Sequence, residues 1–183
     1  MKRSQLEHII RAAGDVLGED RVIIVGSQAI LASFPEDALP VEAIRSLEVD
    51  ILPIDDPDEA KADLIDGVLG ELGQFDENFG IHADGVSEST SVLPERWRTR
   101  LIPYANVNTN GVTGLCLERH DLCVAKLAAN REKDRAFVGA LLRSGIVDPE
   151  LVIERVDQSG IAPERRHEIA VFVRAAGLSR GEE

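Results

Sequence analysis

The sequence is short of aromatic residues and cysteines, and it contains no long apolar run. Aromatic residues make up 4% of the 183 residues, so the core has to be built mainly from Leu, Ile, Val and Ala. No apolar stretch approaches the length of a membrane span, and the basic start MKRSQLEHII is not followed by a signal-peptide pattern. These absences predict a cytoplasmic protein without a membrane contact.

The two cysteines and the charge balance argue against further classes. Cys116 and Cys123 lie in apolar surroundings at a spacing that is not a zinc pattern, so we expect buried free thiols. The formal net charge is −13. Because phosphate contacts require Lys and Arg, we expect no DNA binding, and an RNA substrate would need a local basic patch. The acidity also suits a protein that binds divalent cations or a basic partner protein.

Hydrophobic periodicity predicts an alternation of helices and strands in the first two thirds of the chain. The expected helices cover residues 4–17, 28–34 and 57–72, separated in one place by a polar loop at 36–46. The expected strands cover residues 21–25, 47–53, 80–84, 99–106 and 112–117. The remainder is expected to be helical, with a helix at 120–143 that bends or breaks near 130–132, and two helices that begin near prolines, at 149–157 and 163–176.

This order favours an α/β (α+β) fold in which helices flank a mixed sheet. We expect an α/β core over residues 1–117 and a helical C-terminal part over 118–178 that packs on it. Residues 179–183 are expected to be a disordered tail.

Glu48 and Asp50 lie two residues apart in the strand expected at 47–53, so both side chains share one face. Val49 and Ile51 alternate with them and anchor the opposite face. Two neighbouring carboxylates repel each other and lose hydration, and a divalent cation relieves both penalties. Mg²⁺ prefers a few carboxylates together with substrate phosphates. The alternative is an exposed strand face that carries two solvated charges.

The dipeptide Gly26-Ser27 lies at a turn between an expected strand and an expected helix. A glycine at this place lets the backbone approach a ligand closely. The N-terminus of the following helix offers N–H groups and a positive dipole end, and the Ser27 hydroxyl can donate to a phosphate oxygen. The alternative is that Ser27 only caps the helix.

A Gly-Ser turn followed by an acid-x-acid strand resembles the nucleotidyltransferase superfamily of the DNA polymerase beta type. The resemblance implies a metal-dependent enzyme that takes a nucleoside triphosphate. It implies that Gly26 and Ser27 bind the triphosphate, and that Glu48 and Asp50 are catalytic and hold Mg²⁺ (or Mn²⁺). The superfamily more often has Asp where this chain has Glu48.

A second resemblance covers residues 117–143, LERHDLCVAKLAANREKDRAFVGALLR. This segment is similar to the Lys … Arg-x-Lys-Asp helical segment of bacterial nucleotidyltransferase-fold families, which include uncharacterised families and the abortive-infection type IV toxins. The resemblance implies that Lys126 and Asp134 are catalytic, that Lys126 also binds the nucleotide and meets phosphate charge, and that Asp134 matches the family acid. On the residues alone, Asp134 can instead form a surface ion pair with Arg131 or Arg135.

The spacing of Lys126, Asn130 and Lys133 places them on one face of the helix expected at 120–143. This face is otherwise apolar. A lysine there either extends its amine to water or lines a cleft beside the core.

The superfamily also implies a third metal-binding carboxylate on a later strand. Asp84, in the segment GIHADGV, is our candidate for this third ligand, although Glu77 and Glu88 lie close by. His82 is a candidate base or ligand, and a single histidine is more often structural.

Two further clusters have a functional and a structural interpretation. Arg96, Arg98 and Arg100 surround Trp97 and can hold RNA by stacking and phosphate contact. We prefer a core tryptophan flanked by solvated arginines. Asp121 is expected to cap the helix that begins near residue 120.

Three functions therefore compete. The first is an enzyme that transfers a nucleotidyl group to an RNA, protein or small-molecule acceptor, as a toxin does. The second is a degenerate nucleotidyltransferase-fold protein that binds a cognate partner protein, such as one component of a toxin–antitoxin pair. The third is an acidic helical scaffold with no site. The deciding observation is whether Ser27, Glu48, Asp50 and Lys126 face one cavity.

Overall fold

The computed structural model describes residues 1–179 and contains one five-stranded mixed sheet. The strands follow the order β3-β2-β1-β5-β4 across this sheet. Their bounds are Arg21–Ile24 (β1), Glu48–Leu52 (β2), His82–Gly85 (β3), Ile102–Tyr104 (β4) and Thr113–Cys116 (β5). The predicted α/β fold with a mixed sheet is thus confirmed.

β1 lies at the centre of the sheet because its apolar side chains are covered on both faces. Val22 and Ile24, on one face, have no exposed surface, and Ile23, on the other, is 5% exposed. β1 runs antiparallel to β2 and parallel to β5, while β3 runs parallel to β2. In the register between β2 and β3, Asp50 lies opposite Asp84. This register brings the acidic residues of two strands together.

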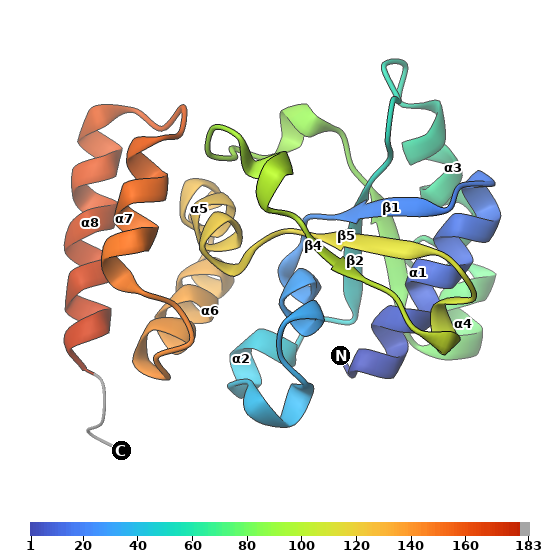
Figure 1. Cartoon of the computed structure of the whole chain (residues 1–183), viewed down its shortest axis with the longest axis horizontal. Helices are drawn as coiled ribbons and strands as arrows, with labels where there is room; N and C mark the ends of the chain where they lie inside the picture. Colours follow the sequence, from blue (N-terminus) through green and yellow to red (C-terminus); the bar gives the residue numbers. More distant parts are fainter. Residues whose placement is uncertain (180–183) are drawn as a thin grey trace.

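The sheet lies between two groups of helices (Figure 1). On one side are α1 (Arg3–Leu17), α3 (Ala60–Leu69) and α4 (Gln74–Phe79). On the other are α5 (Arg119–Ala129), α6 (Glu132–Arg143), α7 (Pro149–Asp157) and α8 (Pro163–Leu178). The short helix α2 (Val41–Ile44) packs against α6. Short 3₁₀ helices complete the chain: η1 (Ser27–Ala32), η2 (Glu36–Ala38), η3 (Glu88–Thr90), η4 (Trp97–Arg100) and η5 (Val107–Thr109).

One hydrophobic cluster runs through the whole assembly. It extends from Leu6 in α1, through Ile24 and Cys116 in the sheet, to Val152 in α7 and Val173 in α8. The core therefore continues across the boundary expected at residue 117, and the division into an α/β core and a helical part stays a prediction. Both cysteines are buried free thiols, as predicted.

Several predicted boundaries shift for local reasons. The helix expected at 28–34 is a six-residue 3₁₀ helix, and the loop expected at 36–46 contains η2 and α2. α3 begins later than expected, because the Asp56 carboxylate accepts hydrogen bonds from the N–H groups of Lys61 (3.0 Å) and Ala62 (2.9 Å). Of the tail expected at 179–183, residues 180–183 lie outside the described residues.

The predicted break near residues 130–132 is confirmed. Asn130 adopts a left-handed conformation with φ of 57° and ends α5, with its N–H donating to the Lys126 carbonyl at 3.0 Å. α6 then begins after Arg131. The single helical face expected to hold Lys126, Asn130 and Lys133 was therefore wrong, because the chain turns between the first residue and the last.

Within residues 1–179, no helix is both long enough and apolar enough to cross a membrane.

Candidate metal and nucleotide site

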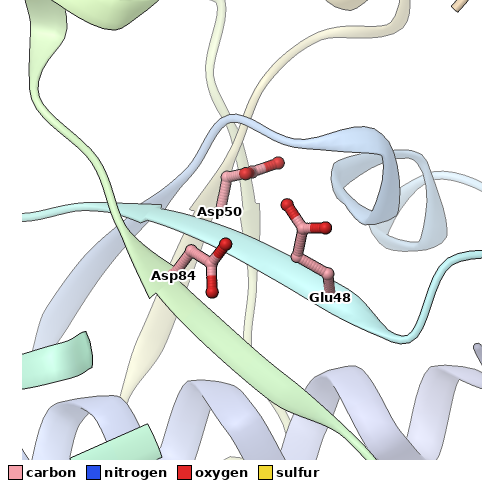
Figure 2. Close-up of side chains that lie close together, drawn as sticks. All are labelled: Glu48, Asp50 and Asp84. Atoms are coloured by element: carbon pink, nitrogen blue, oxygen red, sulfur yellow. The ribbon is translucent and has the colours of Figure 1, made fainter. Parts of the chain in front are cut away.

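Three carboxylates converge on one face of the sheet at its β2–β3 edge. Glu48 and Asp50 project from β2, and Asp84 projects from the neighbouring β3 (Figure 2). One ligand oxygen of each residue lies within 4.8 Å of those of the other two. Val49 and Ile51 fill the opposite face of β2 and have no exposed surface. The alternation expected from the sequence is therefore present, and the strand pairing adds the third acid.

The carboxylate cluster is electrostatically unfavourable by itself. Burial, followed by the negative charge of Glu48, raises the pKa of Asp50 to about 6, and Lys126 opposes this rise. Burial and Glu48 also raise the pKa of Asp84 above its usual value. Within residues 1–179, none of the three carboxylates has a salt bridge to Lys, Arg or His.

The donor set fits a hard divalent cation. Oxygen ligands from a few carboxylates, with room for phosphate oxygens and water, are what Mg²⁺ prefers. A bound cation removes the repulsion that raises both pKa values. Glu48, Asp50 and Asp84 can therefore hold a divalent cation.

Gly26 is required by the close approach of Asp50. A Cβ atom added at Gly26 would lie 1.7 Å from Asp50 Oδ2, which no side chain tolerates. The backbone φ of Gly26 is −78°, so space and not backbone conformation selects glycine here. The Gly-Ser turn and the acid-x-acid strand are thus in direct contact.

Ser27 does not cap the helix that follows it. Gly26 occupies the N-cap position of η1, and no side chain caps this helix. η1 is also a short 3₁₀ helix, and the Ala29 N–H already donates to the Gly26 carbonyl at 3.0 Å. The helix-dipole contribution expected from the sequence is therefore small.

Gln28 contacts a residue of the site, and sequence reasoning missed this role. Its side chain has no exposed surface, and its Nε2 donates to Ser27 Oγ at 3.3 Å and to the Ala43 carbonyl at 3.4 Å. Ser27 Oγ accepts in this contact, so the hydroxyl hydrogen is left for another acceptor. A polar residue in the otherwise apolar segment QAILASF was the available signal.

Lys126 and Arg131 meet at Asp134, whose side chain is only 2% exposed. Arg131 Nε lies 2.6 Å from Asp134 Oδ2, and Lys126 Nζ lies 3.6 Å from Oδ1. Burial favours a higher pKa of Asp134, but the hydrogen bond from Arg131 and the charge of Lys126 lower it below its usual value. The expected pairing with Arg131 is present, but it is buried on the carboxylate side and is not a surface ion pair.

Two cavities open beside the carboxylates. The first, of about 250 Å³, we call the cationic cavity after its four cations, Arg45, Lys126, Arg131 and Lys133; Ser27 and four acids, Glu42, Glu48, Asp50 and Asp134, also line it. The second, of about 360 Å³, is lined by Gly26 of the Gly-Ser turn and, among others, by Val25, Val86, Thr90, Ser91 and Ala129. Asp50, Lys126 and Arg131 line both cavities.

The four residues chosen to decide between the functions all line the cationic cavity. This convergence argues against an acidic scaffold without a site. A family model described as "Nucleotidyltransferase of unknown function (DUF6036)" matches residues 4–173. The chain belongs to this nucleotidyltransferase family. Comparisons with curated proteins and with solved structures gave no match. The resemblance to the abortive-infection type IV group stays a prediction.

The arginines around Trp97 do not form the basic patch that an RNA-binding nucleotidyltransferase would need. Trp97 is 6% exposed and belongs to the core, as preferred from the sequence. Arg98 forms two hydrogen bonds with Glu88, at 2.7 Å and 2.6 Å. Arg100 binds both oxygens of Asp121, at 2.8 Å and 3.0 Å.

Asp121 does not have the capping role expected for it. Glu118 caps α5 instead, and its carboxylate accepts from the N–H groups of His120 (2.9 Å) and Asp121 (3.4 Å). The Asp121 side chain has no exposed surface and pairs with Arg100 and also with Arg155, whose Nε lies 3.4 Å from Asp121 Oδ1. This ion cluster joins η4, α5 and α7.

The other candidates near Asp84 have partners away from the cluster. His82 Nδ1 lies 3.7 Å from Asp76 Oδ1, which gives this histidine a structural contact. Glu88 is held by Arg98. Neither residue, nor Glu77, joins the group of three acids whose oxygens converge.

Proposed function

We propose that this family member is a metal-dependent nucleotidyltransferase that moves a nucleotidyl group from a nucleoside triphosphate to a hydroxyl acceptor. One observation carries the proposal: three carboxylates converge beside a cavity that also contains Ser27 and Lys126. Carboxylates alone suit many cation sites. Carboxylates beside a hydroxyl and several cations suit a cation together with a polyphosphate.

Glu48, Asp50 and Asp84 would hold the metal ion. When bound, Mg²⁺ or Mn²⁺ supplies positive charge to the phosphate oxygens and lowers the pKa of an attacking hydroxyl. Gly26 allows Asp50 to lie against the backbone turn. The Ser27 hydroxyl, positioned by Gln28, donates to a phosphate oxygen.

The cations of the cationic cavity have a division of roles. Lys126 is 13% exposed and lies between the carboxylates and Asp134, so it neutralises phosphate charge at the reacting end. Arg45 and Lys133 line the same cavity and suit the terminal phosphates. Asp134 is best described as a positioning residue, because its contacts are with Lys126 and Arg131.

The alternative is a degenerate family member that binds a partner protein without catalysis. Its support in the sequence was Glu48 at a position that is more often Asp, and the lack of an obvious third acid. The position of Asp84 beside Glu48 and Asp50 favours the active enzyme. A toxin-like role and a cognate partner protein stay predictions.

The test is transfer of the labelled nucleotidyl group from an α-labelled nucleoside triphosphate to RNA, protein or small molecules in the presence of Mg²⁺. ATP, GTP, CTP and UTP are tried in turn as the labelled triphosphate. The double variant Glu48→Ala/Asp50→Ala should abolish transfer and Mg²⁺-dependent triphosphate binding. Asp63→Ala, at an exposed position of α3, is the matched control and should change neither. Tight binding without transfer to any acceptor would support the degenerate alternative, and equal behaviour of the double variant and the wild type would refute the site.

A further inference from the structure

Four large apolar side chains are exposed on α3 and α4. Leu64 and Val68 in α3 are each 45% exposed, Leu72 in the turn that follows is 84% exposed, and Phe79 in α4, which packs against α3, is 51% exposed. We call these four residues the α3 face. Among residues 1–179 ten large hydrophobic residues are exposed, and four of them fall between positions 64 and 79. Single exposed apolar residues are ordinary, whereas a group on adjoining elements marks an interaction surface.

The core of the protein does not account for the α3 face. Ala62, Ile65 and Leu69 supply the buried side of α3. Leu64 and Val68 are four residues apart, so they lie together on another side of the helix, where solvent reaches them. Leaving apolar area in water costs free energy that burial against a partner would recover.

The α3 face is surrounded by acidic residues. Residues 55–79 contain nine Asp and Glu residues, one Lys and no Arg. The single lysine, Lys61, is already paired with Glu19, with Nζ 2.5 Å from Oε1. Within the described part of the chain, the exposed acids Asp63, Glu71 and Glu77 have no salt bridge. The charge around the apolar group is therefore left uncompensated.

The α3 face lies away from the carboxylate site. α3 packs against α1, on the side of the sheet away from α5–α8 (Figure 1). Within residues 1–179, no residue of α1, α3 or α4 lines either of the two cavities beside the carboxylates. A molecule bound to the α3 face would therefore leave both cavities open.

We propose that the α3 face is a docking surface for a partner protein that presents a basic amphipathic helix. The apolar side of such a helix covers Leu64, Val68 and Leu72, with anchors at three- and four-residue steps. The Lys and Arg residues that border this side meet the acids around the α3 face, which adds specificity and speeds encounter. The docking surface is separate from the proposed nucleotidyltransferase site and does not depend on its activity.

The charge disfavours other occupants. In a two-fold contact with a second copy of this chain, the α3 face would meet itself, and the acids would oppose each other. Nucleic acids and anionic membrane surfaces carry the same sign of charge as the surroundings of the α3 face. A cationic helix is the occupant that satisfies both the apolar group and its acidic border.

The probes are three synthetic helical peptides that carry a fluorescent label. The first, the basic peptide, has leucines on one side of the helix and lysines on both borders of that side. The second has glutamates in place of the lysines. The third has the composition of the basic peptide in an order that gives no apolar side. Fluorescence anisotropy measures the affinity of the full chain for each peptide.

The chain offers a matched control on its last helix. Val171 and Leu178 in α8 are 56% and 85% exposed, close to the exposure of Val68 and Leu72. Residues 163–178 contain two Glu and three Arg, so this helix has no acidic border. Val68→Ser/Leu72→Ser and Val171→Ser/Leu178→Ser therefore make the same changes on the two surfaces. Circular dichroism and thermal unfolding establish that both variants keep the fold.

We expect the wild type to bind the basic peptide at least about tenfold more tightly than either of the other two peptides. Added salt should weaken this binding, because the bordering charges are exposed. Val68→Ser/Leu72→Ser should weaken it about tenfold or more, and Val171→Ser/Leu178→Ser should stay within about twofold of wild type. Glu48→Ala/Asp50→Ala should also stay within about twofold, because the peptide does not bind at the carboxylates.

Four results would overturn the proposal. Equal binding of the basic peptide by Val68→Ser/Leu72→Ser and the wild type would show that the α3 face is not the binding surface. Equal binding of all three peptides would remove the requirement for a basic amphipathic helix. Loss of binding in Glu48→Ala/Asp50→Ala would place the peptide at the carboxylate site. Dimers of the wild type in sedimentation equilibrium that Val68→Ser/Leu72→Ser abolishes would make a second copy the occupant. None of these results bears on nucleotidyl transfer, so the proposed function stands or falls separately.

Discussion

Replacing Asp50 by Asn should stabilise the metal-free protein at neutral and alkaline pH. The Asp50 carboxylate is buried beside Glu48 without a salt bridge, and its pKa rises from 3.8 to about 6. The folded protein therefore binds the Asp50 proton more tightly than the unfolded chain. The protonated Asp50 carboxyl contributes stability to the folded protein that is fully present below about pH 4 and is lost as the pH rises through about 6. An asparagine keeps the shape without the charge and so escapes this loss.

The size of the effect follows from the pKa difference. A rise from 3.8 to about 6 corresponds to at most about 3 kcal/mol at a pH above both values. Asp50 lines two cavities that water can enter, which reduces the penalty, so we expect a gain of about 1–3 kcal/mol for Asp50→Asn near pH 8. Near pH 4 the two proteins should be nearly equal in stability.

The assay is urea unfolding in the presence of a chelator, followed by circular dichroism near pH 4 and near pH 8. Asp58→Asn, in the exposed loop before α3, is the control and should change stability by less than about 0.5 kcal/mol at either pH. Saturating Mg²⁺ should reverse the order at pH 8, because it binds the folded wild type and not the variant. If Asp50→Asn is less stable than wild type at pH 8 without metal, the reasoning about the carboxylate cluster is wrong.

Two further predictions concern positions around the site. Gly26→Ala should cost about 1–3 kcal/mol and weaken Mg²⁺ binding, because its Cβ would displace the Asp50 carboxylate. Gly67→Ala, in α3, is the control; no neighbouring atom lies within 4 Å of its added Cβ, so the free energy of unfolding should rise by about 0.5–1 kcal/mol. Thermal unfolding measures the stability of both variants, and Mg²⁺ titration measures their metal affinity. Equal behaviour of the two variants would contradict the contact between Gly26 and Asp50. Asp121→Asn should cost about 3–5 kcal/mol, because it leaves two buried arginine contacts without their anion. Urea unfolding measures this loss, and reduced triphosphate affinity in the folded Asp121→Asn protein would show that the ion cluster also supports the site.

The sequence by itself determined much of the fold and the first half of the site. Period-two alternation in LEVDILP predicted that Glu48 and Asp50 share a face, and this holds because side chains in any strand alternate. The break between α5 and α6 was also predictable, since Asn tolerates the left-handed conformation that ends a helix. These features depend on residues that are close together in the chain.

Only the tertiary structure decided how the separate pieces meet. The β2–β3 register sets Asp84 opposite Asp50, and a shift of one residue would have turned its side chain to the other face. The contact of Gly26 with Asp50, the pairing of Asp134 with Lys126 across the α5–α6 break, and the burial of Asp121 depend likewise on packing between elements. Strand register and helix packing are set by contacts distant in sequence, so the residue pattern predicted which groups are available, and the fold decided which of them share a cavity.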